Sequence, residues 1–397
     1  MIKQAVVLVG GLGTRLGALT EATPKPLLPV GGQPFLKRLL EELLRQGVSD
    51  ILLLAGYRAE QLMFLAESLP GVRVLIEPEP LGTGGALRFA ADHLDERFFF
   101  LNGDSLFDIN LWDLALAAGR SEACLALRPV PDVSRFGPAL IKGDRIVHFA
   151  ERPTTSGPGL INGGVGVLTR QVLKRIPAQG AVSIERDVYP RMAQEGVLRG
   201  RVYDRPFIDI GVPEDFDRAQ TAVPAMLTRG AVIFDRDGVL NHDVAYAHRP
   251  EQIEWVPGAI AAVKAVNDAG LFAFVATNQA GVARGFYGED HVHDLHVWMN
   301  AVLRLHGAQI DAFAHSPYHP DGVVEAYARE SSCRKPNPGM ILDLMGRFSV
   351  NQAKVVMIGD RDTDVAAAQA AGVRGVLFQG GDLKAALAPE LARLSDD

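Results

Sequence analysis

Cysteine is scarce in this chain, since its 397 residues include only Cys124 and Cys333. Two cysteines are too few for a disulfide framework, which fits a reducing compartment. Long apolar runs are also lacking. The first run, Ala5 to Val9, stops at two glycines and is too short for a signal-peptide core or a membrane span. We therefore predict a soluble cytoplasmic protein with no membrane partner.

Blocks of basic residues are missing as well. The formal net charge is −7, and no stretch of Lys and Arg is sustained along the chain. Surfaces that bind nucleic acid carry clustered positive charge, so we expect no nucleic-acid partner. Any anionic substrate must then be held by local groups and by metal ions. The sequence carries no signature of an oligomeric state.

The chain is long enough for more than one domain. At about 100 to 200 residues per domain, 397 residues predict two or three. We predict a first domain at 1–222, a linker at 223–229 that carries a proline, and a second domain at 230–397. Apolar runs alternate with helical patterns in the first domain and end in polar motifs in the second. This predicts an α/β fold with two doubly wound domains.

Two acids end the apolar run at 231–234, because Asp235 and Asp237 are followed by Gly238. Such a run predicts a buried strand, and ligands of open α/β sheets bind at the carboxyl ends of strands. Two carboxylates this close need a cation between them or a shared proton. An Asp turn or a helix cap is the alternative for this motif taken alone.

Further polar residues follow apolar runs downstream. Thr277 ends the run at 271–276, Lys335 lies in Cys-Arg-Lys-Pro, and Asp360 and Asp364 follow 355–359. The four motifs, in this order, resemble those of the haloacid dehalogenase phosphohydrolases. Few residues separate the first motif from the second, so we expect a Rossmannoid domain without a large cap.

The resemblance implies a role for each of these residues. Asp235 is the nucleophile that forms an aspartyl phosphate, and Asp237 is the general acid and base. Lys335 and Thr277 stabilise the phosphoryl oxygens. Mg²⁺ is held by Asp235, by the carbonyl of Asp237 and by Asp360. The expected substrate contacts are Asn278, Arg284 and Arg334.

The family often carries a zinc loop with four Cys and His ligands, and this sequence departs from it. The corresponding positions are Ser316, Tyr318, Ser331 and Cys333, which leave one ligand of four. A closed zinc site needs about four nitrogen or sulfur donors. His315 and His319 lie nearby at unfamiliar spacing, and surface loop histidines are the commoner explanation. We expect no zinc.

A glycine-rich loop, residues 10–15, follows the first apolar run. Exposed backbone N–H groups in such a loop form an anion nest. The loop lacks the third glycine of a dinucleotide fingerprint and the Gly-Lys-Ser/Thr of a Walker A motif. Lys25 lies between two prolines, which hold it in a stiff, extended segment suited to a phosphate contact. An Arg15 and a Lys25 without any role are the alternative.

The run G-G-x-G-T-R-L, followed by P-K-P-L-x-P-V-G-G, resembles the signature of the sugar-phosphate nucleotidyltransferases. The resemblance implies catalytic roles for Arg15 and Lys25, and Mg²⁺ on Asp104 and Asp209. The expected contacts to nucleotide and sugar are Gly11, Gly13, Gly82, Thr83, Glu151 and Asn162. A glycine-rich helix start without ligand at 82, and a salt bridge and a turn at 151 and 162, are the alternatives.

Within these families the first half looks closest to the guanylyltransferases that act on a manno-heptose 1-phosphate. The second half resembles the heptose 1,7-bisphosphate 7-phosphatases, which are kin to histidinol phosphatase. Together these imply a bifunctional enzyme that removes the 7-phosphate and then transfers a nucleotidyl group, expected to be GMP from GTP, to the 1-phosphate. One alternative is a mannose guanylyltransferase or glucose uridylyltransferase joined to another phosphatase. Another is a phosphatase regulated by a non-catalytic nucleotide-sugar module.

Overall fold

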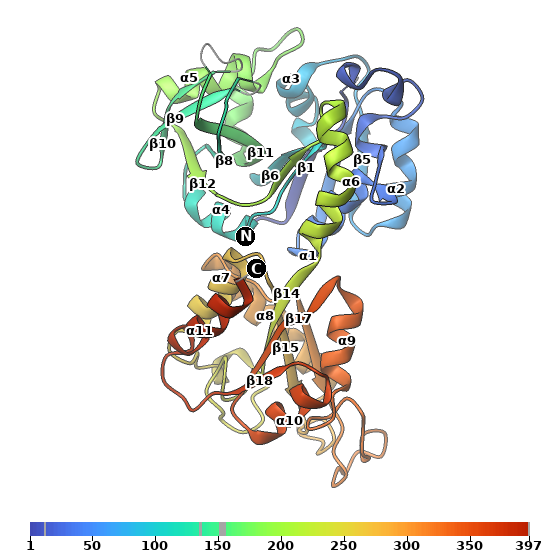
Figure 1. The fold of residues 1–397 in the computed structure, drawn as a ribbon, viewed down its shortest axis with the longest axis vertical. Coiled ribbons are helices and arrows are strands. Elements are labelled where there is room, and N and C mark those ends of the chain that lie inside the picture. The colour runs from blue at the N-terminus through green and yellow to red at the C-terminus, as the bar shows by residue number, and fades with distance from the viewer. Residues whose placement is uncertain (12, 135–136, 151–155, 396–397) are drawn as a thin grey trace. The chain divides into compact units, whose positions relative to one another are not determined.

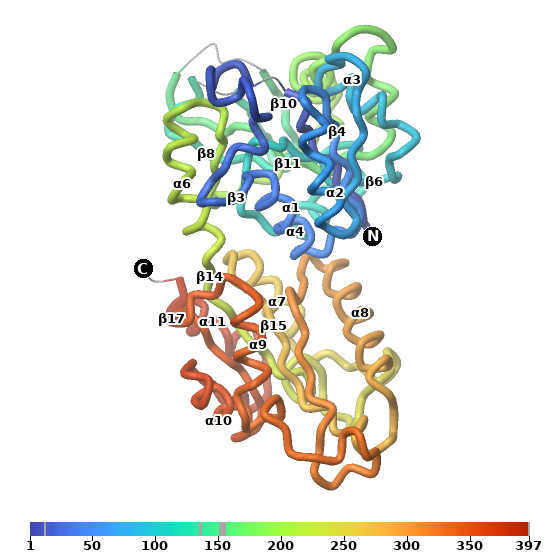
Figure 2. The backbone as a smooth tube through the Cα atoms, turned by 90° about the vertical axis from the view of Figure 1, so that its right-hand side faces the viewer, coloured from blue at the N-terminus to red at the C-terminus, as the bar shows by residue number. Residues whose placement is uncertain are grey.

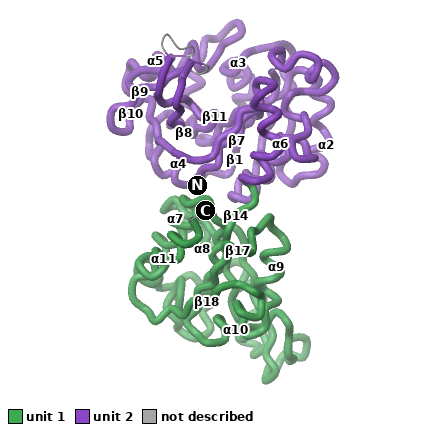
Figure 3. The backbone as a smooth tube through the Cα atoms, in the orientation of Figure 1, with its two compact units in different colours: residues 1, 227–397 green, residues 2–226 purple. Residues whose placement is uncertain are grey.

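The computed structural model describes residues 1–11, 13–134, 137–150 and 156–395. Its contacts divide the chain into two compact units, one of residues 2–226 and one of residues 227–397 together with Met1 (Figure 3). We refer to them as the first and the second unit. Within the described residues, no helix combines the length and apolarity that crossing a bilayer requires.

The first unit is built on a nine-stranded sheet in the order β5-β4-β1-β6-β11-β8-β12-β10-β9 (Figure 1). The first four strands in this order are parallel, and β11 runs antiparallel to both of its neighbours, β6 and β8. In chain order the strands are β1 (Gln4–Leu8), β4 (Asp50–Ala55), β5 (Val72–Ile76), β6 (Arg97–Asn102), β8 (Ala123–Val130), β9 (Pro138–Lys142), β10 (Arg145–Phe149), β11 (Gly159–Thr169) and β12 (Leu198–Val202). Parallel strands buried on both faces explain the unbroken apolar runs of the sequence.

Helices cover both faces of this sheet. They are α1 (Phe35–Arg45), α2 (Met63–Ser68), α3 (Gly82–Phe89), α4 (Leu111–Ala118), α5 (Tyr189–Gln194) and α6 (Pro213–Leu227). The leucines of α1 recur at helical spacing and are buried on one side. On α4, Trp112 packs edge to face on Phe99 of β6, with the ring centroids 5.7 Å apart. On the other face, α3 and α5 share a core with strand residues such as Phe100.

Two segments of the first unit have local features of their own. A 3-10 turn, Ala59–Leu62, precedes α2, and Arg58 before this turn is left-handed (φ 50°) and provides no capping side chain. The residues 223–229 are not a separate irregular segment, since α6 continues to Leu227 and β14 begins at Arg229. Pro224 has no backbone N–H, so α6 lacks one hydrogen bond at this residue. The proline ring lies directly against Gly31.

The second unit has a five-stranded parallel sheet in the order β16-β15-β14-β17-β18. The strands are β14 (Arg229–Phe234), β15 (Phe272–Asn278), β16 (Ala312–Ser316), β17 (Val350–Gly359) and β18 (Arg374–Leu377). The helices are α7 (Ala259–Asp268), α8 (Glu289–Leu305), α9 (Gly339–Arg347), α10 (Asp362–Ala370) and α11 (Leu383–Ser395). The doubly wound α/β prediction is confirmed for both halves of the chain.

Each face of this second sheet has its own core. The helices α7, α8 and α11 share one apolar cluster with the sheet, and α7 and α11 lie side by side (Figures 1 and 2). The helices α9 and α10 share the other cluster. Successive residues of β14 alternate between the two, so Val232 belongs to the first and Ile233 to the second. The central strand β14 is therefore buried on both sides, and its carboxyl end is held rigidly.

We predict that Ile233→Ala lowers the free energy of unfolding by about 2–5 kcal/mol, because it leaves a cavity in a fully buried strand. Urea denaturation followed by circular dichroism measures this change. The control is Val297→Ala on α8, whose side chain is 56% exposed, and it is expected to change stability by no more than about 0.5 kcal/mol. Equal effects of the two substitutions would contradict the described packing.

Candidate functional site

Two acids meet beside the parallel strands of the first unit. Asp104 follows β6, and Asp209 is the last residue of β13 (Phe207–Asp209). The strand β13 pairs with β7 (Ser105–Phe107), and the register sets Asp209 opposite Ser105. The Ser105 hydroxyl lies 3.3 Å from Asp104 Oδ1 and 3.1 Å from Asp209 Oδ2. Strand pairing thus brings together two carboxylates that lie far apart in the sequence.

Two cations converge on these acids. Lys25 Nζ lies 2.5 Å from Asp104 Oδ2. A methyl group placed on Gly211 would lie 2.5 Å from Asp209 Oδ1, 3.4 Å from Lys25 Nζ and 3.5 Å from Arg15 Nη2. The absence of a side chain at Gly211 therefore leaves room for these groups to meet. We call Arg15, Lys25, Asp104 and Asp209 the first cluster.

The electrostatics of the first cluster favour a further cation. Burial raises the pKa of Asp209, the charge of Asp104 raises it further, and Lys25 opposes the rise. Two neighbouring carboxylates with one lysine nearby still repel each other. Their hard oxygen atoms suit Mg²⁺, which commonly binds one or two carboxylates and completes its shell with phosphate and water.

The glycine-rich loop after β1 packs on Lys25 and also faces open space. Gly13 is left-handed (φ 65°), and a side chain there would come within 3.1 Å of the Lys25 Cβ atom. A side chain on Gly11 would meet no atom within 4 Å. The loop thus supports the lysine on one side and leaves backbone free to approach a ligand on the other.

Glu77, directly after β5, was not identified from the sequence. Its carboxylate lies so close to Gly10 and Gly56 that a side chain on either glycine would collide with it. Leu81 N donates to Glu77 Oε2 at 3.3 Å. Burial raises the pKa of Glu77, and the Leu81 hydrogen bond opposes the rise. No sequence motif identified this acid, because its position depends on where three strand ends meet.

A cavity of about 70 Å³ lies next to β11, and Thr83 and Asn162 both line it. The Thr83 hydroxyl accepts from Ile184 N at 2.8 Å, so it holds a neighbouring segment. Asn162 Nδ2 donates to Glu185 Oε1 at 2.7 Å, and Glu185, which the sequence did not single out, lines the same cavity. Gly82 (φ 71°) packs against the Val182 carbonyl and does not line it. Glu151 lies outside the described residues.

In the second unit, Asp235 directly follows β14 and meets a buried lysine. Lys335 is 3% exposed, and its Nζ lies 2.9 Å from Asp235 Oδ2 and 2.6 Å from Asp364 Oδ1. It also donates to the carbonyl of Ala276 at 2.8 Å. All three donors of the ammonium therefore have acceptors. The sequence placed Asp364 in the motif but gave it no role, and the structure gives it this contact.

Asp360 completes an acidic group with a free oxygen. One carboxylate oxygen from each of Asp235, Asp360 and Asp364 lies within 4.8 Å of the others. Asp360 Oδ1 is buried and has no hydrogen-bond partner among the described residues. Burial and Asp364 both raise the pKa of Asp360. An orphaned carboxylate oxygen beside two further acids fits a hard cation such as Mg²⁺. We call Asp235, Asp360, Asp364 and Lys335 the second cluster.

Asp237 points into a different environment from Asp235. Both of its oxygens accept from the fully buried Arg236, at 3.1 Å from Nε and 2.8 Å from Nη2. Gln279 Nε2 and Asn241 Nδ2 add bonds of 3.0 and 2.9 Å. Burial would raise the pKa of Asp237, but the charge and hydrogen bonds of Arg236 and these amides lower it overall. Burial dominates at Asp235 and raises its pKa to about 6, against the opposing Lys335.

A cavity of about 350 Å³ opens above the second cluster. Among the residues proposed from the sequence, those lining it are Asp235, Asp237, Thr277, Asn278, Arg284, Arg334 and Lys335. The amide of Asn278 engages the backbone of Lys335 at both ends, at 3.0 and 3.1 Å, so it positions the lysine. Arg334 donates to the carbonyl of Tyr318 at 3.1 Å. His319 was discussed only as a metal ligand, and it also lines the cavity.

Three of the four positions discussed above for a zinc loop form a hydrogen-bonded group. Cys333 Sγ lies 3.1 Å from Ser331 Oγ and 3.4 Å from Ser316 Oγ. The fourth position, Tyr318, has its ring under the guanidinium of Arg329, 4.6 Å from the ring centroid. The loop is thus held by hydroxyl, thiol and cation–π contacts.

Comparisons with known proteins agree with this division of the chain. A family model described as nucleotidyl transferase matches residues 4–225, and one described as HAD-hydrolase-like matches residues 332–395. The chain is 36% identical to D-glycero-alpha-D-manno-heptose 1-phosphate guanylyltransferase of Campylobacter jejuni, over 54% of this chain and 96% of the relative. It is 44% identical to D-glycero-beta-D-manno-heptose-1,7-bisphosphate 7-phosphatase of Rhodopseudomonas palustris, over 39% of this chain and 86% of the relative.

A solved structure also resembles the chain. The crystal structure of HddC from Yersinia pseudotuberculosis has a TM-score of 0.50 and 33% identity, over 55% of this chain and 98% of that one. A second crystal structure of that protein is complexed with GMP-PN. Both resemblances inferred from the motifs are confirmed. The chain belongs to the nucleotidyl transferase family through its first unit, and to the HAD-hydrolase-like family of the 7-phosphatases through its second.

Proposed function

We propose that the chain catalyses two consecutive reactions on a heptose phosphate. The second unit hydrolyses the 7-phosphate of D-glycero-D-manno-heptose 1,7-bisphosphate, and the first unit transfers GMP from GTP to the heptose 1-phosphate that remains. One observation carries the proposal: each unit holds its own cluster of acids and a lysine. The matched relatives are named for two reactions on D-glycero-D-manno-heptose phosphates: the Rhodopseudomonas palustris phosphatase is named for the beta anomer, the Campylobacter jejuni guanylyltransferase for the alpha anomer, and the phosphatase of Thermosynechococcus vestitus for neither.

Phosphate cleavage follows from the surroundings of the two motif acids in the second unit. The Asp235 carboxylate attacks phosphorus while the bond to the sugar oxygen breaks, which gives an aspartyl phosphate and splits a difficult hydrolysis into two displacements. Asp237 protonates the leaving oxygen and then takes the proton of the attacking water, a role worth about 10² to 10⁴ in rate. Lys335 and the Thr277 hydroxyl stabilise the phosphoryl oxygens.

Nucleotidyl transfer in the first unit needs no covalent intermediate. An oxygen of the sugar 1-phosphate attacks the α-phosphorus of GTP in line, and pyrophosphate leaves. Arg15 and Lys25 neutralise the charge that develops on the leaving group. Gly11 and Gly13 allow the backbone close to the phosphates. Asn162, beside the small cavity, is the proposed sugar contact in the described part of the chain.

Magnesium suits both clusters. In the first it would be held by Asp104 and Asp209, and in the second by Asp235, Asp360 and the carbonyl of Asp237. The orphaned oxygen of Asp360 and the raised pKa of Asp209 support this assignment. When bound, the ion supplies positive charge to the phosphate oxygens.

Glu77 supports guanine as the base. The Watson–Crick edge of guanine presents two adjacent donors, N1–H and the N2 amino group, and a carboxylate accepts both. Uracil and thymine present a single donor, N3–H, flanked by two carbonyl oxygens, which a carboxylate repels. The carboxylate of Glu77 lies against the loop that carries Gly10, next to the phosphate-binding backbone. We therefore assign Glu77 to base selection.

The regulatory alternative predicts that a non-catalytic module has lost some of its charged groups. Arg15, Lys25, Asp104 and Asp209 are all present in the sequence and converge in one cluster. This favours a catalytic first unit. Assays with mannose 1-phosphate, glucose 1-phosphate and other phosphate esters distinguish the remaining enzyme pairs from the proposed one.

Single substitutions are expected to separate the two activities. Asp235→Asn removes the nucleophile and should lower phosphate release by at least about 10⁴-fold, while GTP-dependent nucleotidyl transfer to supplied heptose 1-phosphate is unchanged. Asp104→Ala should abolish nucleotidyl transfer and leave phosphate release unchanged. Malachite-green and pyrophosphate assays measure the two products. Loss of both activities from either substitution would overturn the model of two independent centres.

The nucleotide preference is expected to depend on Glu77. Glu77→Gln replaces one acceptor by a donor, so kcat/KM with GTP should fall about 10- to 100-fold relative to UTP. The control is Glu79→Gln, an exposed acid two residues away, which should leave the preference unchanged. If the ratio of GTP to UTP activity were the same in Glu77→Gln and wild type, the assignment would be wrong.

Removing the buried lysine is expected to make stability depend more strongly on pH. The folded pKa of Asp235, about 6, exceeds the ordinary 3.8, so its ionisation costs the native state stability as pH rises. Without Lys335 this pKa rises further. We therefore expect Lys335→Met to lower the free energy of unfolding by about 3 kcal/mol at pH 8, and by less at pH 5, where carboxylates regain protons.

Urea midpoints at the two pH values, in buffer with EDTA, measure this difference. The control is Arg347→Met, which breaks an ion pair to Asp343 with both side chains more than half exposed. Such a pair contributes at most about 1 kcal/mol, and its loss should be similar at both pH values. An equal loss of stability at pH 5 and pH 8 for Lys335→Met would contradict the electrostatic account.

A further inference from the structure

The loop after β14 has an unusual backbone beside the large cavity of the second unit. Ala245 and Tyr246 are consecutive and both left-handed, with φ of 55° and 58°. Residues other than Gly, Asn and Asp rarely adopt this conformation, because the Cβ atom crowds the backbone. Both residues line the cavity that holds Asp235 and Lys335. A strained segment at the mouth of a reactive cavity points to a functional constraint.

Contacts on both sides enforce this conformation. Asp243 Oδ1 accepts from Ala245 N at 3.0 Å, and Asp243 Oδ2 pairs with Arg361 Nη2 at 2.8 Å. On the other side, His248 Nδ1 lies 2.8 Å from the carbonyl oxygen of Tyr246. The loop is therefore fixed at the end of β17 and again two residues beyond Tyr246.

The contact of His248 connects the loop, through other side chains, to Asp237, the proposed general acid. The ring of His248 stacks on Tyr287 at 4.6 Å and 17°. The Tyr287 hydroxyl donates to Gln279 Oε1 at 2.9 Å, and Gln279 Nε2 donates to Asp237 Oδ2 at 3.0 Å. The position of Tyr246 is thus tied through described contacts to a residue that faces the reacting atoms.

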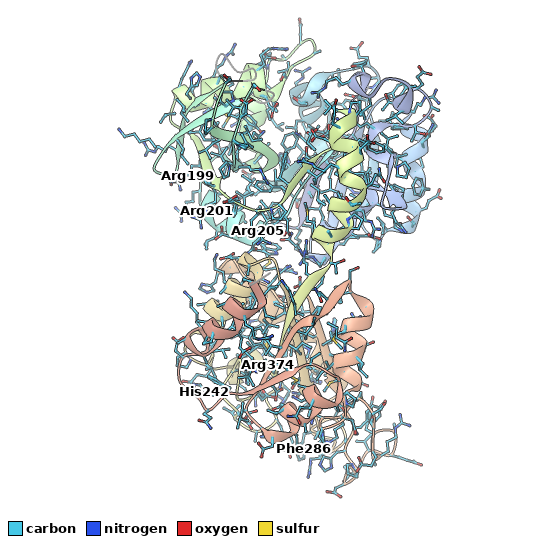
Figure 4. The ribbon with its side chains drawn as sticks, in the orientation of Figure 1. Arg199, Arg201, Arg205, His242, Phe286 and Arg374 are labelled. Atoms are coloured by element: carbon cyan, nitrogen blue, oxygen red, sulfur yellow. The ribbon has the colours of Figure 1, made fainter. Side chains whose placement is uncertain are left out.

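The result is an exposed aromatic pair, of which Tyr246 lines the cavity and Phe286 packs on Tyr246. Tyr246 is 39% exposed and Phe286 is 58% exposed, and their rings meet edge to face with centroids 4.8 Å apart. Phe286 lies in the loop after β15 and is labelled in Figure 4. We call these two residues the aromatic rim. Two large apolar side chains left in water beside a reactive cavity mark a binding surface.

The other residues that line the cavity indicate what the aromatic rim binds. Its other lining residues above the reactive acids are mostly charged or polar, including Arg284, Arg334, Arg361 and His319. These groups suit phosphates and hydroxyls but offer no surface to the C–H face of a sugar. An aromatic ring does offer one.

We propose that the aromatic rim, Tyr246 and Phe286, packs against the carbon skeleton of the sugar phosphate and selects sugar phosphates over small phosphate esters. The inference rests on the proposed phosphatase reaction and adds its specificity determinant. The rim is a positioning surface, while Asp235 and Asp237 do the chemistry. The constrained backbone at Ala245 and Tyr246 holds the Tyr246 ring ready before the substrate arrives.

The test uses glycine substitutions in the full chain. Tyr246→Gly removes the ring and also relieves the left-handed backbone, so we expect unchanged or higher thermal stability. The KM for the sugar bisphosphate should rise about tenfold, with kcat nearly unchanged, while kcat/KM for acetyl phosphate, which has no sugar, stays within about twofold. Phe286→Ala should give the same pattern, and Tyr246→Phe should resemble wild type.

The matched control is Ala245→Gly, which relieves the left-handed backbone of the residue before Tyr246 and keeps both aromatic rings. It should leave kcat/KM for acetyl phosphate unaffected and raise the KM for the sugar bisphosphate by less than Tyr246→Gly does. The proposal is overturned if sugar and acetyl phosphate lose activity equally, if neither changes, or if Ala245→Gly raises the sugar KM as much as Tyr246→Gly does.

Failure of the proposed function gives a different result. If the wild-type protein does not hydrolyse the heptose bisphosphate, the proposed substrate is wrong. The rim is then tested on the sugar phosphate that the protein hydrolyses fastest, again compared with acetyl phosphate. If Tyr246→Gly has the same ratio of kcat/KM for that sugar phosphate to kcat/KM for acetyl phosphate as wild type, the aromatic rim does not select sugar phosphates. This holds whichever sugar is the substrate.

Discussion

A lysine ammonium in contact with carboxylates near strand ends is the interaction on which both centres depend. Lys335 contacts Asp235 and Asp364 in the second unit, and Lys25 contacts Asp104 in the first. Carboxylates this close repel each other in a buried place, and only a nearby positive charge lets them stay ionised. Much of the surrounding structure serves this arrangement, since parallel strands end there and glycines leave room for the charged groups.

The surroundings of each cluster decide which reaction it supports. In the second unit, Asp235 is buried against one lysine, while Asp237 is held by Arg236 and two amides. The partners of Asp237 favour its ionised form, which is the form that takes the proton of the attacking water in the proposed reaction. In the first unit the acids face two cations and an open glycine loop. That arrangement suits the binding of a triphosphate and the departure of pyrophosphate.

The sequence predicted what depends on the order of residues along one strand and its following turn. Asp235 after 231–234 and the glycine loop after the first apolar run are examples, because strand period and loop chemistry are local. It did not predict Asp364 as a partner of Lys335, Glu77 beside Gly10, or Tyr246 at the cavity mouth. These positions depend on which strands lie side by side and on a left-handed backbone that Ala and Tyr rarely adopt. The linker at 223–229 stays a prediction of the domain boundary, and helix and strand continue through most of it.

The central claim is that the two clusters act on two phosphorus centres in a fixed order. The second cluster cleaves a phosphate before the first transfers the nucleotidyl group. Time-resolved ³¹P NMR of the wild-type protein with heptose 1,7-bisphosphate, Mg²⁺ and GTP tests it directly. The account predicts that inorganic phosphate appears first and without any need for GTP, and that pyrophosphate and the nucleotide sugar follow only when GTP is present. Phosphate release that requires GTP, or pyrophosphate that appears before inorganic phosphate, would contradict it.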